Sequence, residues 1–146
     1  MGHRRVEGGL VFADISGYTR LSERLASRGR AGSEEAVELI DSVLRAIIDA
    51  IEARGGDVLD FAGDALVALF DGDDAPLRAT STAAAIRGWF DRRAADVTSV
   101  GRVVLRAAVA VATGPVDLVL AGSDEMVLCT AGPTATRLVL LERAAS

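Results

Sequence analysis

The chain has 146 residues, half of them hydrophobic and a quarter charged, which is the size and composition of one globular domain. Its net charge of −5 at pH 7 argues against a nucleic-acid surface, which needs a clustered basic face. The single cysteine, Cys129, cannot form an internal disulfide, and no apolar run approaches the roughly 20 residues of a membrane span. We therefore expect one cytoplasmic domain, spanning 1–146, that binds neither nucleic acid nor membrane.

The first third of the chain predicts one strand and two helical segments. The apolar run GGLVFADI (8–15) is typical of a central strand, and residues 16–32 pass from a turn into a short helical pattern and then a loop. Ser33 is the predicted N-cap of a long helix with two glutamates in its first turn, and Gly55–Gly56 end that helix. His3 is expected to lie in a disordered terminus.

A hairpin is predicted next, in the stretch GGDVLDFAGDALVALF. Its arms are residues 58–62 and 65–70, and Gly63–Asp64 form its turn. A loop and an alanine-rich helix follow within residues 71–93, with Pro76 in the first turn, where proline is tolerated. The remaining chain predicts three strands and a final helix, at residues 102–116, 116–122, 125–132 and 133–145.

This order of elements mixes crossover helices with hairpins, which favours an α+β fold. We expect a ferredoxin-like split-βαβ core, in which a mainly antiparallel sheet carries helices on one face. The first strand then lies beside the hairpin. In that arrangement Asp14, at the end of the strand, meets Asp64, at the turn of the hairpin.

Two carboxylates brought together at strand ends repel, and each tends to take up a proton unless a cation lies between them. Mg²⁺ prefers one or two carboxylates together with substrate phosphates. Beside Asp14, the segment ISGYT (15–19) supplies a glycine-containing turn before a helix, whose free N–H groups can hold a phosphate. A single aspartate at a strand end is more often only a cap or turn residue, but the pair with its glycines favours a nucleoside-triphosphate site.

Four segments of the chain resemble a known family, in the family's order: VFADISGYTRLSE, GGDVLDFAGDALVALF, TGPV and AGPTATRLVLLERAA. Together they look like the class III nucleotidyl cyclase (adenylate/guanylate cyclase) catalytic domain. The resemblance is closest to the N-terminal cyclase-homology domain of soluble adenylyl cyclase-like proteins. Because such domains often precede an ATPase module, the chain is interpreted as one domain, open to being a fragment of a longer protein.

The resemblance implies a two-metal site at a dimer interface, with Mg²⁺ or Mn²⁺ held by Asp14, Asp64 and the carbonyl of Ile15. It implies that residues 15–19 hold the triphosphate of ATP or GTP, with Gly63 in the turn beside Asp64. The residues of that segment are Ile15, Ser16, Gly17, Tyr18 and Thr19. The metals would activate the ribose 3′-hydroxyl for attack on the α-phosphorus and neutralise the departing pyrophosphate.

The half of the site that the partner subunit supplies in this family departs from the family pattern here. Asp60 stands at the position of the base-reading lysine, and Cys129 at the second base-reading position. An acidic residue with a cysteine resembles guanylate cyclases, although a small buried strand residue is the favoured reading of Cys129. Thr136 and Leu140 replace the asparagine and arginine that act on the transition state, with Arg137 three residues from Leu140 as a speculative substitute.

Three functions are compatible with this pattern. The first is a cyclase-type domain that forms a cyclic nucleotide and pyrophosphate only with a complementary partner, as a homodimer or heterodimer. The second is a catalytically inactive nucleotide-binding or dimerisation module that regulates an attached domain. The third is a purely structural interaction domain, against which the retained Asp14 and Asp64 argue.

Overall fold

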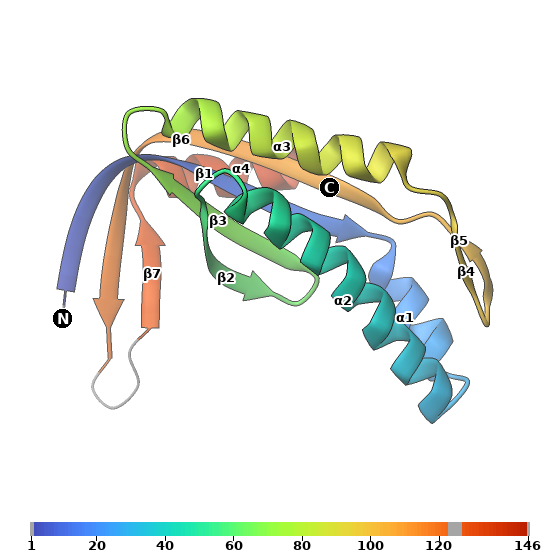
Figure 1. Cartoon of the computed structure of the whole chain (residues 1–146). Coiled ribbons are helices and arrows are strands. Elements are labelled where there is room, and N and C mark those ends of the chain that lie inside the picture. Colours follow the sequence, from blue (N-terminus) through green and yellow to red (C-terminus); the bar gives the residue numbers. More distant parts are fainter. Residues whose placement is uncertain (1, 123–126, 146) are drawn as a thin grey trace.

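The computed structural model describes residues 2–122 and 127–145. A five-stranded sheet, four helices and a separate two-stranded ribbon make up this part of the chain (Figure 1). In chain order the elements are β1 (Gly2–Ser16), α1 (Tyr18–Ala26), α2 (Arg30–Glu52), β2 (Asp57–Ala62), β3 (Ala65–Asp71), α3 (Ala75–Arg92), β4 (Asp96–Thr98), β5 (Gly101–Val103), β6 (Arg106–Ala121), β7 (Val127–Ala131) and α4 (Pro133–Ala145).

The sheet has the strand order β2-β3-β1-β6-β7, and every neighbouring pair is antiparallel. Strands β1 and β2 therefore run parallel to each other with β3 inserted between them, which is the split-βαβ arrangement. The predicted fold class is confirmed, as is the prediction that β1 lies beside the β2–β3 hairpin. In the register of β1 with β3, Asp14 is opposite Ala65.

Apolar side chains cover both faces of the sheet. On one face Val11, Ala13 and Phe70 are buried with residues from α1, α2 and α3. On the other face Leu10 and Phe12 are buried with Leu138 from α4. The expectation of helices on one face is therefore wrong for α4. The physical reason is that β1 is apolar on both sides, so both sides need cover.

Two predicted boundaries also differ from the structure. Helix α2 begins at Arg30, so Ser33 lies inside it and its hydroxyl donates to the carbonyl of Gly29 instead of capping the helix. Gly29 has a φ of 78°, a conformation that a glycine adopts without strain, and it ends the preceding loop. The strands expected at 102–116 and 116–122 form one strand, β6, which begins only at Arg106.

The amino-terminal half of β1 is ordered by a buried charge. Asp117 of β6 is 8% exposed, and its carboxylate accepts hydrogen bonds from Arg5 at 2.7 and 2.8 Å and from His3 at 2.9 Å. The guanidinium of Arg5, followed by the His3 ring, lowers the pKa of Asp117 to about 2. The prediction of a disordered His3 is therefore wrong, because this residue pairs across the sheet.

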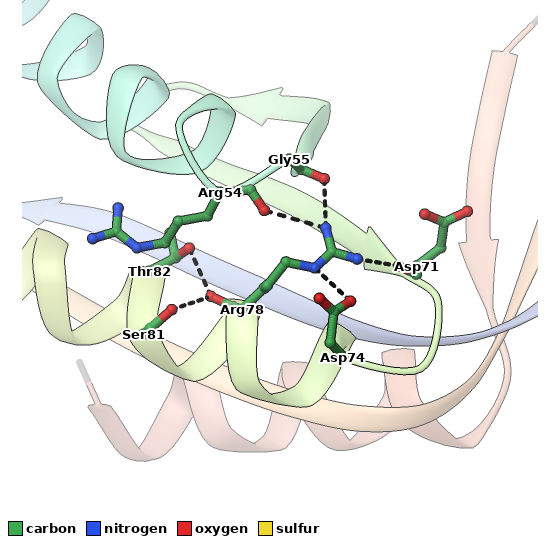
Figure 2. A network of polar contacts seen from close by, with 7 residues as sticks. All are labelled: Arg54, Gly55, Asp71, Asp74, Arg78, Ser81 and Thr82. Atoms are coloured by element: carbon green, nitrogen blue, oxygen red, sulfur yellow. Dashed lines mark hydrogen bonds and ion pairs between the residues drawn. The ribbon is translucent and has the colours of Figure 1, made fainter.

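Arg78 of α3 fastens the base of the hairpin (Figure 2). Its guanidinium donates to the carbonyls of Arg54 at 3.2 Å and Gly55 at 2.9 Å, just before β2, and to the carbonyl of Asp71 at the end of β3. It also pairs with Asp74 at 2.8 Å. One side chain thereby joins the two ends of the hairpin to α3, while the turn at the other end stays free to approach β1.

No helix in the described ranges is long and apolar enough to cross a membrane.

Candidate active site

Asp14 and Asp64 meet where β1 ends and the hairpin turns. The N–H of Ile15 donates to the carbonyl of Asp64 at 3.2 Å, which ties the two backbones together at this point. Both carboxylates line the same cavity, of about 610 Å³, on the face of the sheet that α4 covers. The structure thus brings together the two aspartates that the sequence singled out, because strand pairing places the turn of the hairpin at the end of β1.

The electrostatics of this pair are unfavourable without a cation. Burial raises the pKa of Asp14 above its ordinary value, and the nearby charge of Asp64 raises it further. Glu142 of α4 adds to this effect, whereas a hydrogen bond from the N–H of Ile15 opposes it. Sequence reasoning did not identify Glu142, because only the packing of α4 on the sheet brings it near Asp14.

The donor set at this point fits a hard dication. The described residues contain no group of three or more His, Cys, Asp or Glu side chains arranged to hold a metal. Asp14 and Asp64 would be the carboxylate ligands, and backbone, substrate and water oxygens would complete the shell. Mg²⁺ is usually bound in this way, through one or two carboxylates plus phosphates.

The segment 15–19 connects this carboxylate pair to a helix N-terminus. The Ile15 side chain is buried in the core, which leaves only its backbone groups available at the site. Gly17, with a φ of 90°, precedes the first residue of α1, Tyr18. The Tyr18 hydroxyl donates to the carbonyl of Ala36 at 3.2 Å and anchors α1 on α2. The turn before α1 is therefore anchored to α2.

The exposed side of the same segment faces the carboxylates. The Thr19 hydroxyl donates to Oδ2 of Asp64 at 3.3 Å. Ser16 is exposed, and so is Gly63 in the hairpin turn, where a φ of 66° suits glycine. The first N–H groups of α1 lack carbonyl partners within their helix, as in any helix N-terminus. The segment thus offers N–H and hydroxyl donors beside the two carboxylates.

The two candidate base-reading residues also lie together. Asp60 of β2 and Cys129 of β7 line one groove of about 270 Å³, although these strands are the opposite edges of the sheet. Both side chains are exposed, so the expectation that Cys129 is buried is wrong. Cys129 lies on an edge strand, and the curvature of the sheet, which the sequence does not reveal, brings that strand near β2. Asp60 therefore lines a cleft and is not buried in the strand. This groove and the Asp14 cavity share Val67 and Thr130.

The helix α4 carries no cation into the Asp14 cavity. Thr136 lines the cavity, and its hydroxyl donates to the carbonyl of Gly132 at 3.1 Å. Leu140 is 60% exposed. Arg137, the suggested substitute for an arginine, donates instead to the carbonyl of Thr113 on β6 at 3.4 Å. The positions that depart from the cyclase pattern in sequence therefore gain no replacement from this helix.

Over nearly its whole length the chain has the fold of class III nucleotidyl cyclase domains. The adenylyl cyclase CyaB from P. aeruginosa matches with a TM-score of 0.77 at 21% identity, over 99% of this chain and 74% of that one. The guanylyl cyclase Cya2 matches with a TM-score of 0.75 at 25% identity, over 99% and 73%. The resemblance that the sequence motifs indicated is confirmed.

Similarity in sequence is more local. Adenylate cyclase type 10 of Homo sapiens is 42% identical over 66 residues, which is 44% of this chain and 4% of the human protein. The corresponding protein of Rattus norvegicus is 41% identical over the same length. The chain thus spans only a small fraction of the curated relatives that it matches. No model of a known protein family matches the chain.

Proposed function

We propose that this chain is the metal-holding half of a class III nucleotidyl cyclase, which converts a nucleoside triphosphate into a cyclic nucleotide and pyrophosphate together with a complementary subunit or domain. The observation that carries the proposal is the meeting of Asp14 and Asp64 at one cavity, beside the N-terminus of α1. The proposal treats residues 1–146 as one cyclase-homology domain of a cytoplasmic protein.

In the proposed reaction, the ribose 3′-oxygen attacks the α-phosphorus, forming a P–O bond while the bond to pyrophosphate breaks and the hydroxyl proton passes to solvent water. The chemistry that a divalent metal would supply here is a lower pKa for that hydroxyl and neutralisation of charge on the leaving group. Asp14, Asp64 and the Ile15 carbonyl would hold the metal. Thr19 orients Asp64 through its 3.3 Å hydrogen bond. The N–H groups of residues 15–19 would bind the phosphates.

A partner is needed because the chain lacks cations where the reaction needs them. Asp60 occupies the base-reading lysine position, and Leu140 the arginine position, by resemblance to the family. An arginine that stabilises transferring phosphate is worth on the order of 10³-fold or more in rate. The partner would dock on α4 beside the cavity, where Val139 and Leu140 are 47% and 60% exposed. A homodimer would repeat the deficiency, so a heterodimer is the proposed active form.

Where a second copy of this chain supplies the base-reading half, the groove of Asp60 and Cys129 supports binding of guanine. A carboxylate accepts hydrogen bonds, and the Watson–Crick edge of guanine offers two donors, N1–H and the exocyclic amine. In the present structure, Oδ1 of Asp60 accepts from the N–H of Phe61 at 2.8 Å, which leaves Oδ2 available. ATP remains the alternative substrate.

The same substitutions favour a second candidate function, a catalytically inactive module that binds nucleotide and regulates an attached or partner protein. Measuring cyclic nucleotide formation separates the two. The purified chain is assayed alone and with a cyclase domain that carries the lysine, asparagine and arginine but lacks the metal aspartates, in Mg²⁺ and in Mn²⁺.

Turnover only in the mixture, abolished by Asp14→Asn but retained by the exposed control Asp57→Asn, is the result expected for a cyclase. Metal-dependent nucleotide binding without turnover in any mixture would favour the regulatory module. Absence of both metal and nucleotide binding would refute both functions.

A further inference from the structure

A second polar cleft lies between the carboxyl-terminal end of α3 and the beginning of β6, which run alongside each other (Figure 1). We call it the arginine cleft. Its volume is about 240 Å³, and its polar lining residues are Arg87, Asp91, Arg93 and Arg106. Phe90 and Leu105, both buried, form part of its apolar lining. It shares no lining residue with the Asp14 cavity.

Two of the three arginines have no partner in the described part of the chain. The side chains of Arg87 of α3 and Arg106 of β6 make no hydrogen bond or ion pair there. The helix dipole favours cations only within the last turn, where α3 carries Arg92, so it accounts for neither Arg87 nor Arg106. Two unpaired guanidinium groups thus converge on one cleft from separate elements.

The third arginine is held in place. Nε of Arg93 donates to Oδ2 of Asp96 at 3.1 Å, and its Nη2 donates to Oδ1 at 2.6 Å. The guanidinium also lies over the Trp89 ring, at 4.7 Å from the centroid. A guanidinium has five N–H donors, and these two hydrogen bonds use two. Arg93 is therefore a fixed cation with donors to spare.

The local charge balance favours an anion, in contrast to the whole chain. Three arginines and Asp91 line the cleft, and Asp96 neutralises one of the arginines, so one positive charge remains. The chain as a whole carries −5 and repels anions at long range. Anion binding at this cleft would therefore come from the arginines that line it and not from the net charge of the chain.

We propose that the arginine cleft is a binding site for an oxyanion of the phosphate class, separate from the proposed nucleotide site. Arginine suits this ligand because its planar fork of donors matches phosphate oxygens. The volume accommodates a phosphate or pyrophosphate group rather than a whole nucleotide. The proposal does not depend on cyclase activity.

Nuclear magnetic resonance titration of the full chain tests the site. Orthophosphate and, separately, pyrophosphate are added in EDTA, so that metal-dependent binding at Asp14 and Asp64 is suppressed. Arginine Nε–H resonances and backbone amides report the response. The expected result is a saturable shift at Arg93, Arg106 and the end of α3, with a dissociation constant in the millimolar range. The ratio of the two affinities distinguishes a free phosphate from a polyphosphate ligand.

Matched variants decide whether the shift comes from this cleft. Arg87→Met and Arg106→Met should each weaken binding by about tenfold, the order expected for one charge-assisted hydrogen bond. Asp91→Asn should strengthen it by removing the opposing charge. Arg102→Met, an equal charge change at an exposed residue outside the cleft lining, should leave it within about twofold.

Non-saturable shifts would overturn the proposal, and so would equal weakening by the Arg102 and Arg106 variants. An Asp14→Asn variant that lost the phosphate response in EDTA would move the binding to the other cavity and also overturn it. Failure of cyclic nucleotide formation, by contrast, would leave this result untouched.

Discussion

Replacing Arg78 with methionine is expected to destabilise the fold by opening the base of the hairpin. Arg78 is 25% exposed and donates to the carbonyls of Arg54, Gly55 and Asp71. Methionine keeps most of the apolar stem that packs near Phe70, whose ring centroid is 5.8 Å from the guanidinium carbon. The substitution therefore removes polar contacts and leaves most of the packing.

The magnitude follows from those contacts. A hydrogen bond from a charged group contributes about 1.5–3 kcal/mol, but water can reach part of this site and satisfy some of the freed carbonyls. The ion pair with the largely exposed Asp74 adds about 0–1 kcal/mol. We expect a loss of about 3 kcal/mol in the free energy of unfolding, or a melting temperature lower by about 6–12 °C for a chain of this size.

Urea denaturation followed by circular dichroism measures this loss. Arg78→Lys, which keeps the charge but not the planar fork, should lose about half as much. Arg45→Met is the matched control, because Arg45 makes only an exposed helical pair with Asp41 at 3.0 Å, worth about 0.3–0.5 kcal/mol. If Arg78→Met cost no more than Arg45→Met, the account of Arg78 as the fastening of the hairpin would be wrong.

Four further outcomes are expected. In EDTA, Asp14→Asn should raise the free energy of unfolding at pH 7, because the raised pKa of Asp14 means that its charged form opposes folding. The gain should vanish below about pH 4, where the carboxyl is protonated in the folded and unfolded states alike. An equal gain at pH 3 and pH 7 would contradict this. Arg5→Met should lower the free energy of unfolding at pH 7 and weaken its dependence on pH in acid. The reason is that the folded-state pKa of Asp117, about 2, gives stability above pH 4 that is lost as the pH falls toward 2. Chemical denaturation between pH 2 and 7 measures this dependence, and the same dependence in the variant would count against the Arg5 contact. Gly132→Ala should lower the free energy of unfolding more than Gly63→Ala. Both glycines have a positive φ, of 94° and 66°, but only at Gly132 would the new Cβ meet an atom, Oδ2 of Asp117 at 2.8 Å. We expect a loss of about 1 kcal/mol at Gly63 and of about 2–3 kcal/mol at Gly132, and equal losses would refute the contact. Asp60→Lys should shift the nucleotide affinity of the chain alone, measured by titration with GTP and ATP in Mn²⁺, from GTP toward ATP, and an unchanged ratio of the two affinities would remove Asp60 from base recognition.

The approach of Asp14 to Asp64 could be predicted from connectivity. The apolar run before Asp14 indicates a strand, and Gly63–Asp64 indicate the turn of a hairpin. When this short hairpin pairs with the first strand, few arrangements are possible, and they place the turn beside the end of that strand. Their approach at one cavity could be predicted because strand order constrained it.

The prediction for His3 failed because of a contact remote in sequence. His3 and Arg5 look like a loose polar terminus until Asp117 of β6 pairs with them, 114 and 112 residues away, and local propensity cannot register such a pair. The prediction for Ser33 failed for a local reason, because Gly29 turns the chain and the helix begins at Arg30.

By itself the sequence determined most of the elements, the α+β class and the identity of the carboxylate pair, because periodicity, turn residues and motif order are local properties of the chain. It did not predict the β4–β5 ribbon. Only the tertiary structure decided what lies on each face. The curvature of the sheet brings Asp60 and Cys129 of opposite edge strands to one groove, and the packing of α4 brings Glu142 near Asp14. The arginine cleft likewise exists only because α3 packs beside β6. The two elements are held together by the burial of apolar side chains such as Phe90 and Leu105.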